Sequence, residues 1–174
     1  MDRPRTPLED LFRELVWQVF AGPLQTRDHA LLLYLAAMLA EFAHRDRLYR
    51  LRDARQRPLE QVAAMLREGD LLLDAGSLDR EWQVHKHIGD FTLFVTGIWP
   101  EWHARLGRSG QADALLDYPA TGRHSYYVAS TFQHGPYRAA APVLRRLSED
   151  YELCRFGLNL VRAELDRLGQ RPSP

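Results

Sequence analysis

Apolar residues recur every three or four positions through almost every long segment of this chain, and this spacing constrains the fold more than any other feature. It places apolar side chains on one face of an α-helix. One such series follows Thr6-Pro7-Leu8-Glu9, which combines a capping threonine, a proline at the first helical position and a capping-box glutamate. A second series is Tyr151, Cys154, Leu158, Val161, Leu165 and Leu168. The pattern predicts an all-α protein.

The same spacing predicts helices along most of the chain and no strand. A first helix ends at Gly22-Pro23, and a second begins at residue 26 or 28 and continues past residue 42. The helices expected after it cover residues 58–68, 78–99, 100–106, 111–116, 124–133 and 136–168. The last range has a kink at Pro142 or a recapping at Ser148. The segment ending at residue 42 is apolar nearly all round, so we expect it to be central. Residues 1–174 should therefore form a single-domain bundle of six to eight helices with a frayed tail at 169–174.

The composition fits a folded, non-membrane protein. The chain has 174 residues, 45% of them hydrophobic, and 23 basic and 23 acidic groups give a formal net charge of zero. Zero net charge argues against a nucleic-acid binder and against a membrane-surface protein. The longest apolar run, Ala30–Ala40, is shorter than the roughly 20 residues that a membrane-spanning helix needs. One cysteine, Cys154, and the lack of a signal-peptide pattern favour a cytoplasmic location.

Charge is nevertheless divided unevenly along the chain. Residues 45–57 hold six arginines against two aspartates, a net charge of +4, whereas residues 60–81 hold six acidic residues against two arginines, a net charge of −4. Arg47, Tyr49 and Arg50 are residue types that can grip phosphate. The favoured interpretation is a solvated connection that pairs with the acidic block. All basic groups except Lys86 are arginine, as GC-rich coding favours.

The most distinctive segment for chemistry is residues 81–94. Helical geometry lets Lys86 reach Asp90 at i+4, and it directs His85 and His87 about 160° apart. A buried polar site could use His85 or His87 with Asp90. The favoured alternative is a tightly crossed core helix in which Lys86 or a backbone N–H satisfies Asp90. Gly89, like Gly97, would then mark a place where another helix or a ligand comes close.

A metal site is a second hypothesis. Glu41 and His44 have the Glu-x-x-His spacing that di-iron bundles use on two helices. The sequence has no second Glu-x-x-His pair, and Glu81 with His85, at i and i+4, is the nearest substitute for it. The favoured interpretation of Glu41 and His44 is a charged helix end.

Other reactive side chains lack a catalytic context. His124 and Ser125 are adjacent, but neighbouring side chains diverge on a helix, and no nucleophile motif is present. Cys154 lies on an apolar stripe, so we expect an inert core residue. Trp99 and Trp102 flank Pro100, and one of them could face a partner.

One block of the chain resembles a bacterial family. The block comprises residues 86–94, Lys-His-Ile-Gly-Asp-Phe-Thr-Leu-Phe, and residues 97–101, Gly-Ile-Trp-Pro-Glu. Asp117-Tyr118, Gly122, Ser125-Tyr126-Tyr127, Ser130 and residues 156–161 belong to the same pattern. It is similar to a family of bacterial all-helical proteins to which no activity is assigned. The resemblance implies a bacterial, single-domain helical protein, and it draws attention to Asp90, Glu101, Ser125 and Tyr126.

Three functional hypotheses follow. The leading one is a non-catalytic module that binds a protein partner or itself, with Trp99, Trp102, Arg47 and Arg50 at the contact surface. The second is a metal-dependent enzyme with Glu41, His44, Glu81 and His85 as ligands and Asp90 as a further candidate. The third is a small-ligand pocket lined by Asp90, Ser125, Tyr126 and Tyr127. No cofactor is indicated apart from the metal ion of the second hypothesis.

Overall fold

The architecture is all-helical, as predicted. A computed structural model of the chain describes residues 6–44, 50–53, 55–56, 59–70, 77–106 and 112–169. Within these residues there are eight α-helices, two short 3-10 helices and no strand. The α-helices are α1 (Pro7–Ala21), α2 (His29–Phe42), α4 (Val62–Gly69), α5 (Leu78–Ile98), α6 (Pro100–Leu106), α7 (Tyr118–Ser130), α8 (Ala141–Glu149) and α9 (Tyr151–Arg167). The 3-10 helices are η1 (Ala112–Leu115) and η2 (Gly135–Tyr137).

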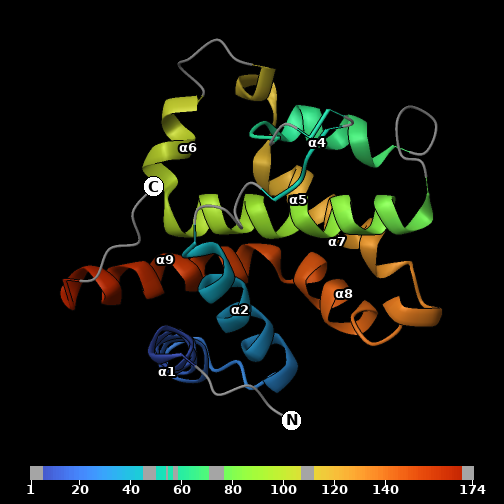
Figure 1. Cartoon of the computed structure of the whole chain (residues 1–174). Helices are drawn as coiled ribbons and strands as arrows, with labels where there is room; N and C mark the ends of the chain where they lie inside the picture. The colour runs from blue at the N-terminus through green and yellow to red at the C-terminus, as the bar shows by residue number, and fades with distance from the viewer. Residues whose placement is uncertain are drawn as a thin grey trace.

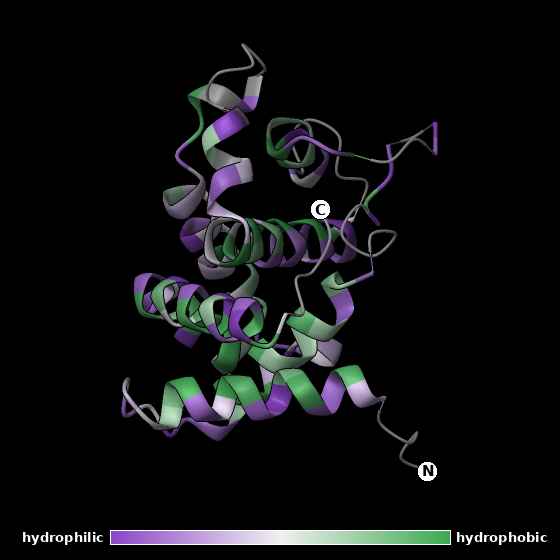
Figure 2. Cartoon of the chain, turned by 90° about the vertical axis from the view of Figure 1, so that its left-hand side faces the viewer, coloured by the Kyte–Doolittle hydropathy of each residue, from purple (hydrophilic) through white to green (hydrophobic). Residues whose placement is uncertain are grey.

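Helix α5 is the axis of the bundle. In Figure 1 it runs across the whole molecule, with α4 above it, α9 and α8 below it and α7 behind it. Every residue from His87 to Ile98 is buried. The sequence predicted α2 as a central helix, and α2 does bury eight of its residues, yet Leu33 on its outer side is 36% exposed. Most helices carry a hydrophobic and a hydrophilic side, which Figure 2 shows in green and purple.

Glycines set how closely the helices approach α5. A Cβ atom at Gly89 would lie 2.6 Å from Cδ1 of Tyr126 on α7, and one at Gly97 would lie 2.7 Å from Cβ of Leu158 on α9. Both distances are far inside van der Waals contact, so a side chain there would push the neighbouring helix away. The prediction that these two glycines mark close approaches is confirmed.

Several helix boundaries differ from the prediction; α4, for example, begins at Val62 rather than at residue 58. Helix α7 begins at Tyr118, six residues before the expected start at 124, because the Asp117 side chain accepts a hydrogen bond from the Ala120 N–H (3.0 Å) and Pro119 favours the first turn. The break in the last region falls at Asp150 rather than at Pro142 or Ser148. Ser148 does not recap the helix, since its hydroxyl donates to the carbonyl of Arg123 (2.9 Å).

Helix α4 and η1 form a small upper layer above α5 (Figure 1), and one aspartate holds α4 in it. Helix α4 has no cap from its own N-terminal residue, Gln61. Asp113 of η1 supplies it instead, with its carboxylate accepting from the N–H groups of Val62 (2.8 Å) and Ala63 (2.9 Å). The Tyr118 hydroxyl donates to the same carboxylate at 2.6 Å. A residue 50 positions away therefore caps α4.

None of the helices in the described residues has the length and apolar character needed to cross a bilayer.

Candidate functional site

A buried carboxylate joins three helices at the centre of the bundle. Asp90 on α5 is 3% exposed. Its Oδ1 accepts hydrogen bonds from the hydroxyls of Tyr34 on α2 (2.7 Å) and Tyr126 on α7 (2.8 Å). Its Oδ2 accepts from Nζ of Lys86, one helical turn earlier, at 2.7 Å. Both oxygens are thus occupied by donors of this chain.

Local geometry explains how these donors reach Asp90. The i+4 spacing brings the Lys86 ammonium onto the carboxylate, as the sequence predicted. That ammonium also lies 5.2 Å from the centre of the Tyr34 ring, in a cation–π contact. Tyr126 reaches Asp90 because its ring packs against Gly89, where no Cβ intervenes.

The two tyrosines serve this cluster as neutral donors. Burial, followed by the charge of the Asp90 carboxylate, raises the pKa of Tyr34 and of Tyr126 well above the usual value. Neither hydroxyl is therefore a base near neutral pH. The arrangement suits a structural tie between helices better than proton transfer, because each donor is already directed at the carboxylate.

His85 and Ser125 form a separate pair. His85 Nδ1 lies 3.4 Å from Ser125 Oγ, at the outer limit for a hydrogen bond. Ser125 is fully buried. Burial and then the nearby His124 lower the pKa of His85 to about 4, against the opposing effect of Asp70. At neutral pH the imidazole is uncharged, and the serine beside it is not exposed to solvent.

His87 lies elsewhere in the core. Its ring is fully buried, 5.6 Å from the centre of the Phe42 ring and 6.2 Å from that of Phe91. The residues of the predicted polar site therefore lie in three places: Asp90 with Tyr126, His85 with Ser125, and His87 against Phe42 and Phe91. Of the residues predicted to line a small-ligand pocket, Asp90, Ser125 and Tyr126 are buried, whereas Tyr127 is 45% exposed.

The four predicted metal ligands do not meet. Glu41 makes an ion pair with Arg50 at 2.8 Å. Helix α2 contacts α5 through Tyr34 at Asp90 and through Phe42 at His87, and Glu81 lies six residues before His87, about 9 Å along the helix axis. No three His, Cys, Asp or Glu residues of the described ranges are grouped so that they could hold a metal ion, which leaves Glu41, His44, Glu81 and His85 without a shared site.

The predicted partner surface changes as well. Trp99 is only 6% exposed, with its ring 4.8 Å from that of Phe94, so it belongs to the core rather than to a contact surface. Trp102 is partly buried and packs against the same core. Arg50 is engaged by Glu41, and Arg47 lies outside the described residues. Cys154 is buried as predicted, and burial followed by Asp150 raises the pKa of its thiol to about 12.

Three important residues were not predicted. Tyr34 was counted with an apolar run, although a buried tyrosine hydroxyl needs a partner, and this need is the signal that could have found it. The capping role of Asp113 left no local signal, because the N–H groups that it caps lie 50 and 51 residues away. Arg145 stood in a segment treated only as helix.

Arg145 borders a surface groove of about 630 Å³ formed by the end of α7, by η2 and by the start of α8. Its lining residues are Ser130, Gln133, His134, Arg138, Ala141, Pro142 and Arg145. None of them is acidic. Within the described residues, neither Arg138 nor Arg145 is paired with a carboxylate. The groove is thus a basic surface on a protein of zero net charge.

The groove has a fixed framework. Gly135 takes φ +57°, a left-handed conformation that glycine adopts without strain, and so turns the chain from α7 into η2. Tyr137 then ties η2 to the start of α5: its hydroxyl donates to Asp79 (2.8 Å) and its ring lies 5.1 Å from that of Trp82. Arg145 is held with its guanidinium carbon 4.4 Å from the centre of the Tyr127 ring.

A second groove, of about 450 Å³, has a different character. It lies between α1 and the start of α2 and is lined by Asp10, Arg13, Glu14, Trp17 and His29. Two carboxylates, Asp10 and Glu14, accompany a single arginine, Arg13, so this groove is not a basic surface.

No protein-family model, curated protein or solved structure matches this chain. Its resemblance to a bacterial helical family stays a prediction, and function is inferred from the chain's own residues.

Proposed function

We propose that this chain is a non-catalytic binding module, and that it binds a protein partner through the face made by α7, η2 and α8. The observation that carries this proposal is the groove at that face, in which Arg138 and Arg145 stand without a carboxylate partner in the described residues. An acidic group of another molecule would complete their electrostatic environment. The proposal includes a bacterial, cytoplasmic setting, supported by the arginine excess and the single cysteine.

The composition of this face supports protein binding. Tyr127 is exposed and stacks with Arg145, and tyrosine and arginine are the residue types most enriched at the energetic centres of protein interfaces. The interior polar groups are engaged with one another: Tyr34, Tyr126 and Lys86 all point at Asp90. Such a network supports a structural role for these interior polar groups, which is to hold the helices together.

The same face favours a different protein over a second copy as the partner. In a symmetric dimer the same patch of each subunit meets. Pairing this groove with itself would bring Arg138 and Arg145 against their own counterparts, and like charges across an interface oppose association. Self-association through another face is an outcome that light scattering of the purified chain would reveal.

The test is a comparison of two charge-reversal variants of the full chain. Arg138→Glu/Arg145→Glu inverts the groove, and Arg27→Glu/Arg105→Glu makes the same charge change at two exposed positions that do not line it. Each tagged protein is expressed in the source organism, and the proteins that copurify are quantified by mass spectrometry. We expect a partner to be recovered with the wild type and the control and to fall at least tenfold with the groove variant. Equal recovery with both variants, or no partner with the wild type, would refute the proposal.

A further inference from the structure

We propose that the groove between α7 and α8 receives a phosphate group carried by a side chain of the partner protein. This inference rests on the proposed function and adds the chemistry that the groove recognises. Phosphorylation of a serine, threonine or tyrosine places about −1.5 to −2 charges and three acceptor oxygens on one small group.

The charge of the groove fits such a group. Arg138 and Arg145 bring two positive charges and no lining residue is acidic. A single carboxylate would neutralise one of the two arginines, whereas a phosphate dianion would neutralise both. Guanidinium groups are also the side chains best shaped for phosphate, because their planar fork of N–H donors matches two of its oxygens at once.

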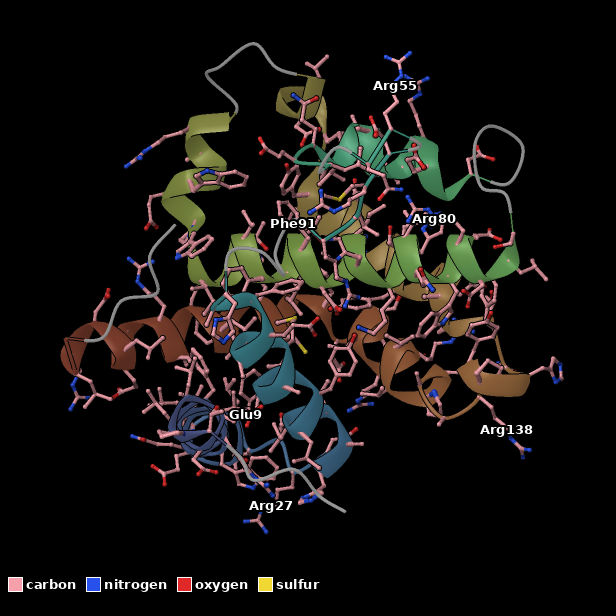
Figure 3. All side chains as sticks on the ribbon, viewed as in Figure 1. Glu9, Arg27, Arg55, Arg80, Phe91 and Arg138 are labelled. Carbon is pink, nitrogen blue, oxygen red and sulfur yellow. The ribbon has the colours of Figure 1, made fainter. Side chains whose placement is uncertain are left out.

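The positions of the donors fit as well. Arg145 is oriented by its contact with Tyr127 at 4.4 Å, so little freedom remains to be lost when an anion binds. Arg138 stands at the outer corner of the molecule beside the start of α8, with its guanidinium toward solvent (Figure 3), where it can fold over an entering group. Gln133 and His134, in the turn between α7 and η2, also line the groove and carry N–H donors.

The start of α8 contributes in the same direction. Ala141 and Pro142, its first two residues, line the groove, and no side chain caps this helix. The partial positive charge of a helix N-terminus adds to that of the arginines. The groove beside α1 shows the contrast, since Asp10 and Glu14 there accompany Arg13 and would repel an anion.

The binding test uses three small probes and the folded full chain. N-acetyl-O-phosphoserine amide, N-acetyl-glutamate amide and inorganic phosphate are each titrated while the arginine Nε–H signals are followed by NMR. We expect the signals of Arg138 and Arg145 to shift saturably with the phosphoserine probe at a Kd of about 1 mM. The glutamate probe should bind about fivefold more weakly because it has one negative charge.

Matched variants assign the effect to the groove. Arg138→Ala/Arg145→Ala should abolish binding of the phosphoserine probe, and Arg27→Ala/Arg105→Ala should leave it unchanged. Absence of saturable shifts, or equal binding of the glutamate probe, would overturn the phosphate assignment. Tighter binding of inorganic phosphate than of the phosphoserine probe would overturn the assignment to a partner's side chain.

A last arm separates this inference from the proposed function. Phosphatase treatment of the lysate before capture should remove the partner whose recovery depends on Arg138 and Arg145. If that recovery survives the phosphatase and the phosphoserine probe does not bind, the groove binds a protein without reading a phosphate. If the probe binds but no partner depends on the groove, the phosphate site stands and the protein-binding function fails.

Discussion

Replacing Asp113 with alanine should destabilise the protein more than the loss of an ordinary helix cap. The change removes the acceptor for the N–H groups of Val62 and Ala63 and for the Tyr118 hydroxyl. Asp113 is 3% exposed and Val62 is fully buried, so water replaces these bonds poorly. Hydrogen bonds to a charged group contribute about 1.5 to 3 kcal/mol each and are not additive. We expect a loss of about 3 kcal/mol in the free energy of unfolding.

Urea unfolding and hydrogen exchange measure this loss. With a slope of about 2 kcal/mol per molar urea, the midpoint should fall by about 1.5 M. The amides of α4 should lose protection before those of α5, because α4 has only eight residues and no cap of its own.

A second aspartate provides the control. Asp117 is the exposed residue that directly precedes α7 and caps it. Asp117→Ala should therefore lower the free energy of unfolding by about 1 kcal/mol. If Asp113→Ala costs no more than Asp117→Ala, or if the α4 amides keep their protection, then Asp113 does not hold the upper layer in place.

Three further predictions concern α5. Asp90→Ala should lower the free energy of unfolding, measured in urea, by about 4 kcal/mol because Lys86 loses its buried partner. A loss of about 1 kcal/mol or less, which is the net contribution of one hydrogen bond, would contradict this. Gly89→Ala should lower stability by about 1 to 3 kcal/mol through its clash with Tyr126, although alanine favours helix by about 1 kcal/mol; a higher urea midpoint would show that α7 moves freely. The pKa of His85 is about 4 in the folded chain, below its usual 6.5, so the unfolded chain binds more protons between these values and stability falls as pH drops from 6.5 to 4. His85→Gln should flatten that dependence, and an unchanged slope would show that other groups cause it.

The sequence predicts those features that depend on residues close together in the chain. Helical spacing identifies the helices, and the Lys86–Asp90 pair follows from one turn of helix geometry. The sequence predicts the start of α7 too late, because the signal at Asp117 and Pro119 lies inside a glycine-rich polar stretch that resembles a loop.

Contacts between helices could not be predicted in this way. The Tyr34–Asp90 hydrogen bond requires the crossing point of α2 on α5, which is set by packing between residues 56 positions apart. The predicted metal site depends on the same kind of contact: each pair of ligands has plausible spacing on its own helix, but no three such residues of the described ranges come together. The groove combines residues of α7, η2 and α8 whose spacing matches no known motif.

Lys86 gives the molecule a natural chemical reporter. It is the sole lysine of the sequence, and in the folded protein its side chain is 19% exposed with the ammonium held 2.7 Å from Asp90. An amine-reactive reagent can modify this side chain only when the ammonium leaves the carboxylate and loses its proton. The rate of acylation at Lys86 therefore reports how often the Lys86–Asp90 ion pair opens, and it does so in the wild-type chain without an introduced label.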